Sequence, residues 1–166
     1  MRFFKSFKYA FRGIIYCINN ERNMRIHTVV ALYVFGFSFF FHFSRTQYAV
    51  LCLTVSAVLM AELFNTVAEE LSDLAAASFH PVVRIIKDMA SGGVLVCAVF
   101  AVFVGVCLFW NPPVLGGIAV FYLTHPAPLA GLLALTAAAV VFVVLGPIGI
   151  RDLLRKKRKA GKNHFD

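Results

Sequence analysis

Four long runs of apolar residues alternate along the chain with short segments that are polar and mostly basic. The runs cover residues 26–43, 47–69, 92–110 and 128–150. Each run is close to the roughly 20 residues that an α-helix needs to cross a bilayer. The pattern therefore predicts four transmembrane helices, of which the first is the shortest, and an all-α integral membrane fold.

The segment before the first run has the period of an amphipathic helix. In residues 2–18, large apolar side chains share one helical face of about 80°. They are Phe3, Phe7, Phe11, Ile14 and Ile18, and the opposite face carries Lys5, Lys8 and Arg12. Such a helix lies flat at the membrane surface, held by apolar burial and by attraction to anionic lipid. A plain basic arm that only sets the membrane topology is the alternative interpretation.

The composition excludes the soluble classes of protein. Of the 166 residues, 60% are hydrophobic and 14% are charged, and the mean hydropathy is +0.80. A soluble domain has roughly 45–50% apolar and about 25% charged residues. A soluble enzyme, a disordered chain and a fibrous repeat are therefore excluded, and the length suits one membrane-embedded bundle.

The basic residues orient this bundle. All of the 16 Lys and Arg except Arg45 lie in residues 1–25, 70–91 and 151–166. Because loops rich in Lys and Arg stay in the cytoplasm, we expect these three segments, and both termini, to be cytoplasmic. Residues 111–127 are rich in Pro and Gly and are predicted to form an irregular external loop. The basic tail is interpreted as a stop signal and an anchor for anionic lipid, with no role in binding nucleic acid.

A row of polar side chains is the strongest functional signal. Of only eight acids, six lie in or beside the cytoplasmic halves of the predicted spans: Glu21, Glu62, Glu69, Glu70, Asp73 and Asp88. Four polar residues at positions i, i+3, i+7 and i+11 share one helical stripe of about 80°. They are Glu62, Asn65, Glu69 and Asp73. An ionisable group inside a span costs roughly 2.5–3.5 kcal/mol on insertion scales and is a functional hypothesis by default.

Other charged residues are predicted to reach the same layer. Glu21 ends the amphipathic helix just before the first span, and Lys87-Asp88 opens the third span. Carboxylate oxygens gathered at the cytoplasmic interface can hold Mg²⁺ together with substrate phosphates. Ion pairs among Glu21, Arg22, Lys87 and Asp88, or solvation at the interface, are the alternatives. The sequence has neither a GxxxxGK[ST] phosphate loop nor a protein-kinase signature, so any nucleotide is bound by another architecture.

At these residues the chain resembles the prokaryotic diacylglycerol kinase family, which includes the undecaprenol kinases. The resemblance rests on Glu62-x₂-Asn65-x₃-Glu69-x₃-Asp73 and Lys87-Asp88-x₂-Ser91, with Phe11-Arg12-Gly13 and Asn20-Glu21 upstream. It implies a kinase-like membrane domain over residues 1–110, made of the surface helix and a three-span core. The stretch ERNMRIH, residues 21–27, looks more like the undecaprenol-kinase branch. The fourth span, residues 128–150, and the basic cytoplasmic tail, residues 151–166, are additions to the family core.

The resemblance also implies an activity. Members of the family transfer the γ-phosphate of Mg-ATP to the hydroxyl group of a membrane lipid. For this chain the lipid is undecaprenol or diacylglycerol, giving undecaprenyl phosphate or phosphatidic acid, and the sequence leaves that choice open. The family further implies a homotrimer in the bacterial plasma membrane, although the additional span leaves the oligomeric state open.

The same resemblance assigns roles to individual residues. Glu62 is the catalytic general base beside the lipid hydroxyl, and Ser91 is a second residue on the lipid side. Glu21 and Glu69 are the metal ligands for Mg²⁺. The residues expected at the nucleotide are Tyr9, Asn65, Ser78, His80, Lys87 and Asp88.

Two functions of other classes compete with a lipid kinase. A small cation- or proton-coupled transporter would use the acidic row as a relay. Transporters place their charges near the membrane midplane on a two-sided pathway, whereas the acids of this chain lie toward one face. A membrane scaffold that recruits partners through its basic tail is the third option, and it leaves the acidic row unexplained.

Overall fold

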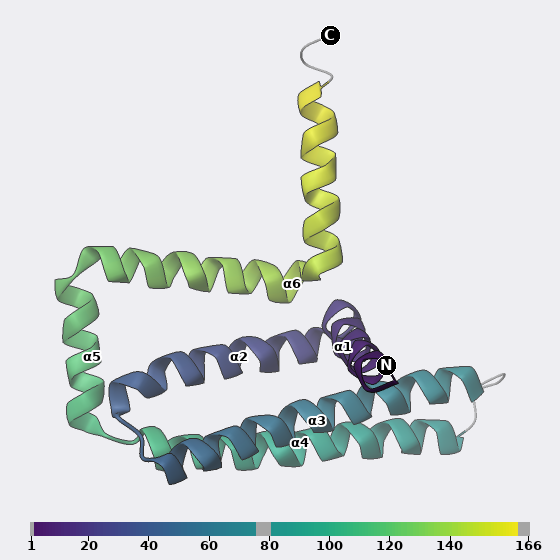
Figure 1. Ribbon diagram of the computed structural model, residues 1–166, viewed down its shortest axis with the longest axis horizontal. Coiled ribbons are helices and arrows are strands. Elements are labelled where there is room, and N and C mark those ends of the chain that lie inside the picture. The colour runs from purple at the N-terminus through teal and green to yellow at the C-terminus, as the bar shows by residue number, and fades with distance from the viewer. Residues whose placement is uncertain (1, 76–80, 163–166) are drawn as a thin grey trace. The chain divides into compact units, whose positions relative to one another are not determined.

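The computed structural model describes residues 2–75 and 81–162, and every element within those ranges is helical (Figure 1). The elements are α1 (Arg2–Asn20), α2 (Arg22–Ser38), the 3₁₀ turn η1 (Phe39–Phe41), α3 (Arg45–Ala75), α4 (Pro81–Phe109), α5 (Pro112–Thr124) and α6 (Pro126–Lys162). Four helical segments of the described chain are long and apolar enough to cross a membrane: Arg22–Phe41, Arg45–Ala75, Pro81–Phe109 and Pro126–Lys156. The all-α, multi-pass membrane fold predicted from the sequence is therefore confirmed.

The chain forms two compact units. One consists of Met1–Ile26 and Ala127–Asp166, and the other of His27–Pro126. The first unit thus contains α1, the beginning of α2 and nearly all of α6. The second contains the rest of α2, the turn η1 and the three helices α3, α4 and α5, which include most of the predicted kinase core.

An antiparallel pair of helices, α3 and α4, forms the framework of the second unit (Figure 1). With 31 and 29 residues, α3 and α4 measure about 46 and 43 Å at about 1.5 Å per residue. The hydrocarbon core of a bilayer is only about 30 Å thick. The helical pair is therefore long enough to continue well beyond the hydrocarbon region.

Both helices extend beyond the apolar runs that were predicted as spans. The sequence pattern suggested spans at residues 47–69 and 92–110 with a loop at residues 70–91. Instead α3 continues to Ala75 and α4 already begins at Pro81, so most of that loop is helical. The physical reason is that apolar runs mark the part of a helix that lies in hydrocarbon, whereas polar turns beyond it are helical as well.

Local signals fix the start of α3. Ser44 Oγ accepts a hydrogen bond of 3.3 Å from the Gln47 N–H, and Gln47 Oε1 accepts one of 2.8 Å from the Ser44 N–H. This reciprocal pair is a capping box, which satisfies backbone donors that have no partner inside the helix. Just before it, His42 has a positive φ of 49°, which ends the turn η1. The chain therefore reverses over a few residues between α2 and α3.

Aromatic side chains join the segments at this end of the helical pair. Phe109 of α4 meets Phe41 and Phe43 edge-on, with ring centroids 4.9 and 5.0 Å apart. Phe43 also contacts Tyr48 of α3 at 5.7 Å. Edge-to-face pairs at these distances are favourable. They hold together the ends of α3 and α4 that lie farthest from the acidic row.

The prediction of an irregular loop at residues 111–127 was wrong, because α5 occupies most of that segment. Asn111 caps the helix by accepting a hydrogen bond of 3.4 Å from the Val114 N–H, and prolines occupy the first two helical positions. Proline is well suited to the first turn, where its missing N–H has no helical partner in any case. The Asn-Pro-Pro sequence is therefore a helix start rather than a loop. The external placement of this segment stays a prediction.

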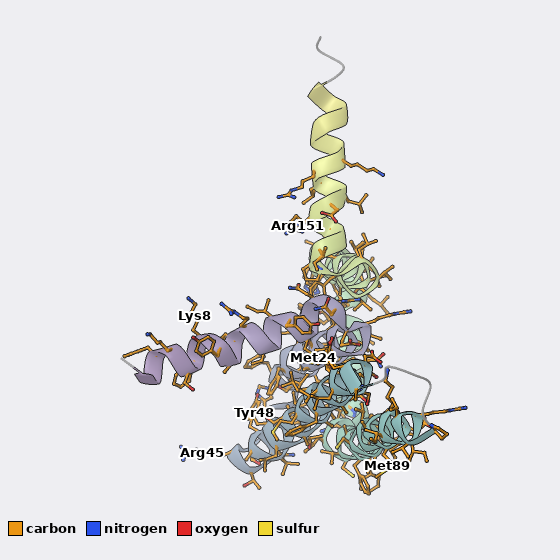
Figure 2. All side chains as sticks on the ribbon, turned by 90° about the vertical axis from the view of Figure 1, so that its right-hand side faces the viewer. Lys8, Met24, Arg45, Tyr48, Met89 and Arg151 are labelled. Atoms are coloured by element: carbon orange, nitrogen blue, oxygen red, sulfur yellow. The ribbon has the colours of Figure 1, made fainter. Side chains whose placement is uncertain are left out.

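The predicted amphipathic segment, residues 2–18, is helical as part of α1. Its apolar face is open: Phe4, Phe7, Phe11 and Ile15 are each more than half exposed. Figure 2 shows Lys8 projecting from α1. An open apolar face on a basic helix suits a position at the membrane surface, which stays a prediction.

The helix α6 bends sharply at Gly146 and Pro147 (Figure 1). Gly146 has φ of 65° and ψ of 171°, values that only glycine adopts readily. The arm before the bend, residues 126–145, is about 30 Å long at about 1.5 Å per residue, which matches the hydrocarbon thickness. The run predicted as the fourth span, residues 128–150, thus contains the bend, and the basic residues follow on the second helical arm.

Candidate active site

The polar row on α3 changes from buried to exposed along the helix. Glu62 is 1% exposed and Asn65 is 6% exposed. Glu69, two turns beyond Glu62, has intermediate exposure, and the side chain of Asp73 is 68% exposed. The helical period predicted that these residues share a face, and the structure adds a gradient of solvent access along that face.

The length of α3 places this gradient relative to a membrane. Measured from Arg45 at about 1.5 Å per residue, Glu62 lies at about 26 Å, Glu69 at about 36 Å and Asp73 at about 42 Å. If Arg45 marks one edge of a hydrocarbon layer about 30 Å thick, Glu62 lies just inside the opposite edge. The other two carboxylates then lie beyond it, where water and nucleotide have access.

Asn65 links the buried and the exposed parts of the row. Its Nδ2 donates a hydrogen bond of 3.0 Å to Glu69 Oε1. Its Oδ1 is buried and accepts no hydrogen bond from the described part of the chain. Because a buried polar atom is usually satisfied in a folded protein, this oxygen suits a bound ligand that offers a donor or a cation.

The opposing helix contributes a cation to the same end of the pair. Lys87 Nζ of α4 forms an ion pair and a hydrogen bond with Asp73 of α3. The Lys87 side chain is 35% exposed, so its ammonium group also faces solvent. One turn farther along, Ser91 Oγ donates to the Lys87 backbone oxygen at 2.8 Å and lies 3.2 Å from that of Asp88. Ser91 is thus held against its own helix.

Among the described residues, Asp88 makes no hydrogen bond or ion pair with a side chain of the polar row. Adjacent residues of an α-helix point about 100° apart, so Lys87 and Asp88 cannot both face α3 equally. Asp88 instead forms an i,i+4 ion pair with Arg84 at 3.9 Å, and both side chains are largely exposed. Lys87 therefore pairs with Asp73, and Asp88 pairs with Arg84.

Two predicted residues lie in the other unit. Tyr9 on α1 is 61% exposed, and the Arg12 guanidinium carbon lies 5.8 Å from the centre of its ring. Glu21 occupies the corner between α1 and α2, where its N–H donates to the Cys17 oxygen at 2.7 Å. The predicted nucleotide residues Ser78 and His80 lie outside the described residues.

The donors present suit a hard cation without forming a complete cage for it. Within residues 2–75 and 81–162, no group of three or more His, Cys, Asp or Glu is arranged to hold a metal ion. The Glu69 carboxylate and the buried Asn65 oxygen are nevertheless the oxygen donors that Mg²⁺ prefers. Magnesium commonly takes only one or two protein carboxylates and completes its shell with water and phosphate oxygens. The residues therefore fit Mg²⁺ carried by a nucleotide rather than a resident ion.

Four buried polar residues of the described chain were missed from the sequence: Arg25, Ser38, Thr66 and Ser72. Thr66 and Ser72 are each 5% exposed on α3, and Thr66 Oγ1 donates to the Glu62 backbone oxygen at 3.0 Å. Thr66 lies four residues after Glu62 and Ser72 seven after Asn65. This helical spacing could have shown that both residues lie near the face of the polar row. Arg25, 7% exposed, received no role at a site from the sequence. Its position near the start of α2 does not predict its hydrogen bonds to the backbone oxygens of Ile18, Asn19 and Val143.

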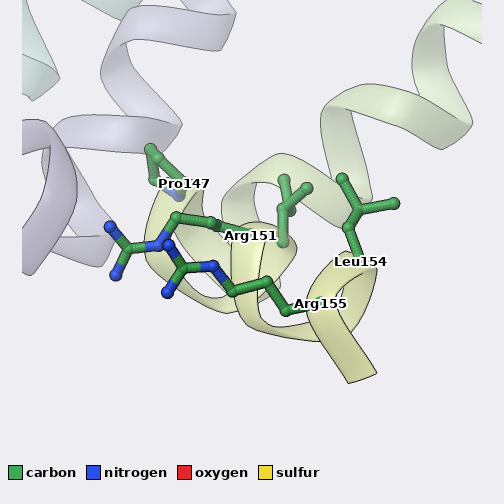
Figure 3. A pocket seen from close by; sticks show the side chains of 5 residues that line it. Pro147, Arg151, Leu154 and Arg155 are labelled. Atoms are coloured by element: carbon green, nitrogen blue, oxygen red, sulfur yellow. The ribbon is translucent and has the colours of Figure 1, made fainter. Parts of the chain in front are cut away.

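A separate hollow of about 310 Å³ lies at the bend of α6 (Figure 3). It is lined by Pro147, Ile150, Arg151, Leu154 and Arg155. None of the residues predicted for catalysis or nucleotide binding lines it. Two guanidinium groups beside apolar side chains suit the predicted role of the tail as an anchor for anionic lipid.

Comparisons with known proteins show to which family the chain is similar. A family model described as prokaryotic diacylglycerol kinase matches residues 8–109. A diacylglycerol kinase of Synechocystis sp. is 41% identical over 108 residues, which are 64% of this chain and 62% of that protein. An undecaprenol kinase of Bacillus subtilis is 35% identical over 108 residues, which are 65% of this chain and 88% of that protein. The chain thus spans less than two thirds of the Synechocystis relative.

The matched region ends with α4, so α5 and α6 lie beyond it. It contains the whole polar row as well as Lys87 and Ser91. The resemblance inferred from the motifs is therefore confirmed, and the chain belongs to the prokaryotic diacylglycerol kinase family.

Proposed function

We propose that the chain is an ATP-dependent kinase that phosphorylates the hydroxyl group of a membrane lipid. The observation that carries this proposal is the polar row of α3, which runs from the buried Glu62 to the exposed Asp73. A lipid presents its hydroxyl at the membrane surface, and ATP arrives from the aqueous side. A row that crosses this boundary is able to contact both substrates.

Phosphoryl transfer needs little covalent chemistry from the protein, because positioning and charge stabilisation supply most of the catalysis. We assign the acceptance of the hydroxyl proton to Glu62, the deepest carboxylate of the row. We assign the ordering of the phosphates to Asn65, whose amide is already aligned with Glu69, and to Lys87, whose ammonium is oriented by Asp73. Asp88 and Tyr9 are assigned to the nucleotide by the family resemblance.

Glu21 and Glu69 are the proposed ligands of Mg²⁺. The Asn65 hydrogen bond orients the Glu69 carboxylate, and backbone bonds at the corner between α1 and α2 orient Glu21. When bound, Mg²⁺ supplies charge neutralisation on the phosphate oxygens. We further propose that the active enzyme is a homo-oligomer, a trimer by analogy with the family, in a bacterial plasma membrane with both termini in the cytoplasm.

The lipid is proposed to be undecaprenol or diacylglycerol, the classes that the names of the two relatives indicate. Both lipids offer a primary hydroxyl at the membrane surface. Ser91, on the helix opposite the row, is the proposed second contact on the lipid side. Apolar contacts with lipid tails carry little readable specificity, so the choice between the two lipids belongs to experiment.

Phosphate transfer from labelled ATP tests the proposal. Purified protein in vesicles that contain either undecaprenol or diacylglycerol is incubated with Mg²⁺ and γ-labelled ATP, and the lipid fraction is counted. We expect label in one lipid class in the presence of Mg²⁺ and none after chelation with EDTA. Label in neither lipid, with protein that is folded by circular dichroism, would rule out both substrates. An ion flux across the same vesicles without lipid phosphorylation would favour the transporter instead.

A further inference from the structure

Arg25 ties the end of the surface helix to the fourth span. Its Nη1 donates hydrogen bonds of 3.1 Å to the backbone oxygens of Ile18 and Asn19, in the last turn of α1. Its Nε donates a hydrogen bond of 3.1 Å to the backbone oxygen of Val143, which is 118 residues away in the sequence. One buried guanidinium group thus holds α1 and α6 together within their unit.

The acceptor in α6 is a carbonyl group that the helix cannot satisfy itself. In a regular α-helix, Val143 O would accept from the N–H group of residue 147. That residue is Pro147, which has no N–H group. An unsatisfied carbonyl group is unfavourable inside a membrane, and Arg25 supplies the missing donor.

Gly146 provides the room for this contact. A Cβ atom at this position would lie 3.0 Å from Arg25 Nη1 and 3.2 Å from its Cζ. Its φ of 65° is also unfavourable for any residue with a side chain. Both residues of the Gly-Pro bend therefore favour the contact with Arg25. Pro147 leaves the Val143 oxygen without a helical donor, and Gly146 leaves space for the Arg25 guanidinium group.

The corner that Arg25 fastens carries Glu21. The Glu21 N–H donates to Cys17 O at 2.7 Å, and the Arg25 N–H approaches Glu21 O at 3.4 Å. The Arg25 side chain returns to the carbonyl groups of Ile18 and Asn19, immediately before this corner. A cation at the carbonyl end of a helix is also favoured by the helix dipole. The backbone of Glu21 is thus held from both sides.

We propose that Arg25 is a positioning residue through which the fourth span sets the place of Glu21. The fourth span would then be a working part of the kinase rather than a peripheral addition. The inference rests on the proposed function, in which Glu21 binds Mg²⁺. The acceptor and the bend lie outside residues 8–109, so the contact belongs to the chain's own extension.

A glycine substitution at the bend disturbs the contact with Arg25. Gly146→Ala places a methyl group against Arg25, whereas Gly131→Ala in the same helix meets no atom within 4 Å. We expect Gly146→Ala to raise the Mg²⁺ concentration for half-maximal lipid phosphorylation about tenfold, as for loss of a group that orients a metal ligand. The KM for the lipid should stay unchanged. Equal Mg²⁺ requirements in the two variants would overturn the proposal.

A conservative substitution tests whether Arg25 and the bend act together. Arg25→Lys keeps the charge but loses the planar set of donors that reaches three carbonyl groups. Arg22→Lys, at an exposed position one turn earlier, is the matched control. If Arg25 and Gly146 act through the same contact, the Arg25→Lys/Gly146→Ala double variant should need no higher Mg²⁺ concentration for half-maximal phosphorylation than the more severe single variant. Effects that multiply would refute the coupling.

A measurement that needs no catalysis distinguishes failure of this inference from failure of the proposed function. Cys17, the residue before Ile18, is 1% exposed. With Cys52, Cys97 and Cys107 replaced by Ala, the rate at which a water-soluble maleimide labels Cys17 reports how firmly this turn is held. Faster labelling in Gly146→Ala than in Gly131→Ala supports the fastening, even if no variant phosphorylates lipid. Equal labelling in the two variants, with phosphorylation intact, overturns it.

Discussion

Lys87 on α4 forms an ion pair with Asp73 on α3, across the two helices. The pair lies at the exposed end of the polar row, and the Lys87 side chain remains one-third open to solvent. Asp73 therefore orients the ammonium group without covering it. A cation held in this way is available to a second anion, which we take to be a nucleotide phosphate.

The first prediction concerns this cation. Lys87→Gln should lower kcat/KM for ATP about a hundredfold, the usual order for loss of a group that stabilises charge in the transition state. Thermal stability should change little, because exposed ion pairs contribute little to folding. Arg84→Gln removes an exposed cation one turn earlier on α4 and serves as the control. Equal losses in the two variants would indicate a general charge effect and contradict the assignment.

The second prediction concerns the metal. Glu69→Gln removes the carboxylate charge while its amide oxygen can still accept the Asn65 hydrogen bond. We expect lipid phosphorylation to fall by a factor of about 100 or more, with an unchanged circular dichroism spectrum. Glu70→Gln, at the next and more exposed position, should retain activity because it lies off the row. Normal turnover of the Glu69 variant at low Mg²⁺ would remove this residue from the metal site.

The third prediction separates nucleotide binding from transfer. Glu62→Gln should lower the rate of transfer about 10²- to 10⁴-fold, the contribution of a general base. Binding of Mg-ATP, measured by calorimetry, should persist because Glu62 is the buried residue of the row and lies farthest from its exposed end. The variant should be at least as stable as the original chain, since a neutral amide is easier to bury than a carboxylate. An active variant would refute the role of Glu62 as base.

The fourth prediction concerns the membrane orientation. In a chain without its four cysteines, Arg45→Cys should react with an impermeant maleimide added to intact cells. Lys156→Cys, on the basic arm of α6, should react only after the membrane is opened. The reason is that loops with few Lys and Arg are the ones exported. The reverse labelling pattern would place the polar row on the outer face, away from cytoplasmic ATP.

Residue spacing alone predicted much of this architecture. The four apolar runs correspond to α2, α3, α4 and α6 because hydrocarbon thickness sets the number of apolar residues a helix needs. The shared face of Glu62, Asn65 and Glu69 follows from the 3.6-residue period. The start of α4 at Pro81 and the helix α5 were missed because hydropathy does not report where backbone hydrogen bonding begins or stops.

Local patterns along the chain thus establish which helices form and which side chains share a face, since both follow from the period and polarity of neighbouring residues. The partners of the charged groups depended on packing. Lys87 pairs with Asp73, and Arg25 with the carbonyl group that Pro147 leaves unsatisfied, because the folded chain brings distant helices together. No local pattern encodes a contact between residues 118 positions apart. Such a contact forms only when tertiary packing brings a donor and an acceptor together at a buried place, where water cannot replace their hydrogen bond.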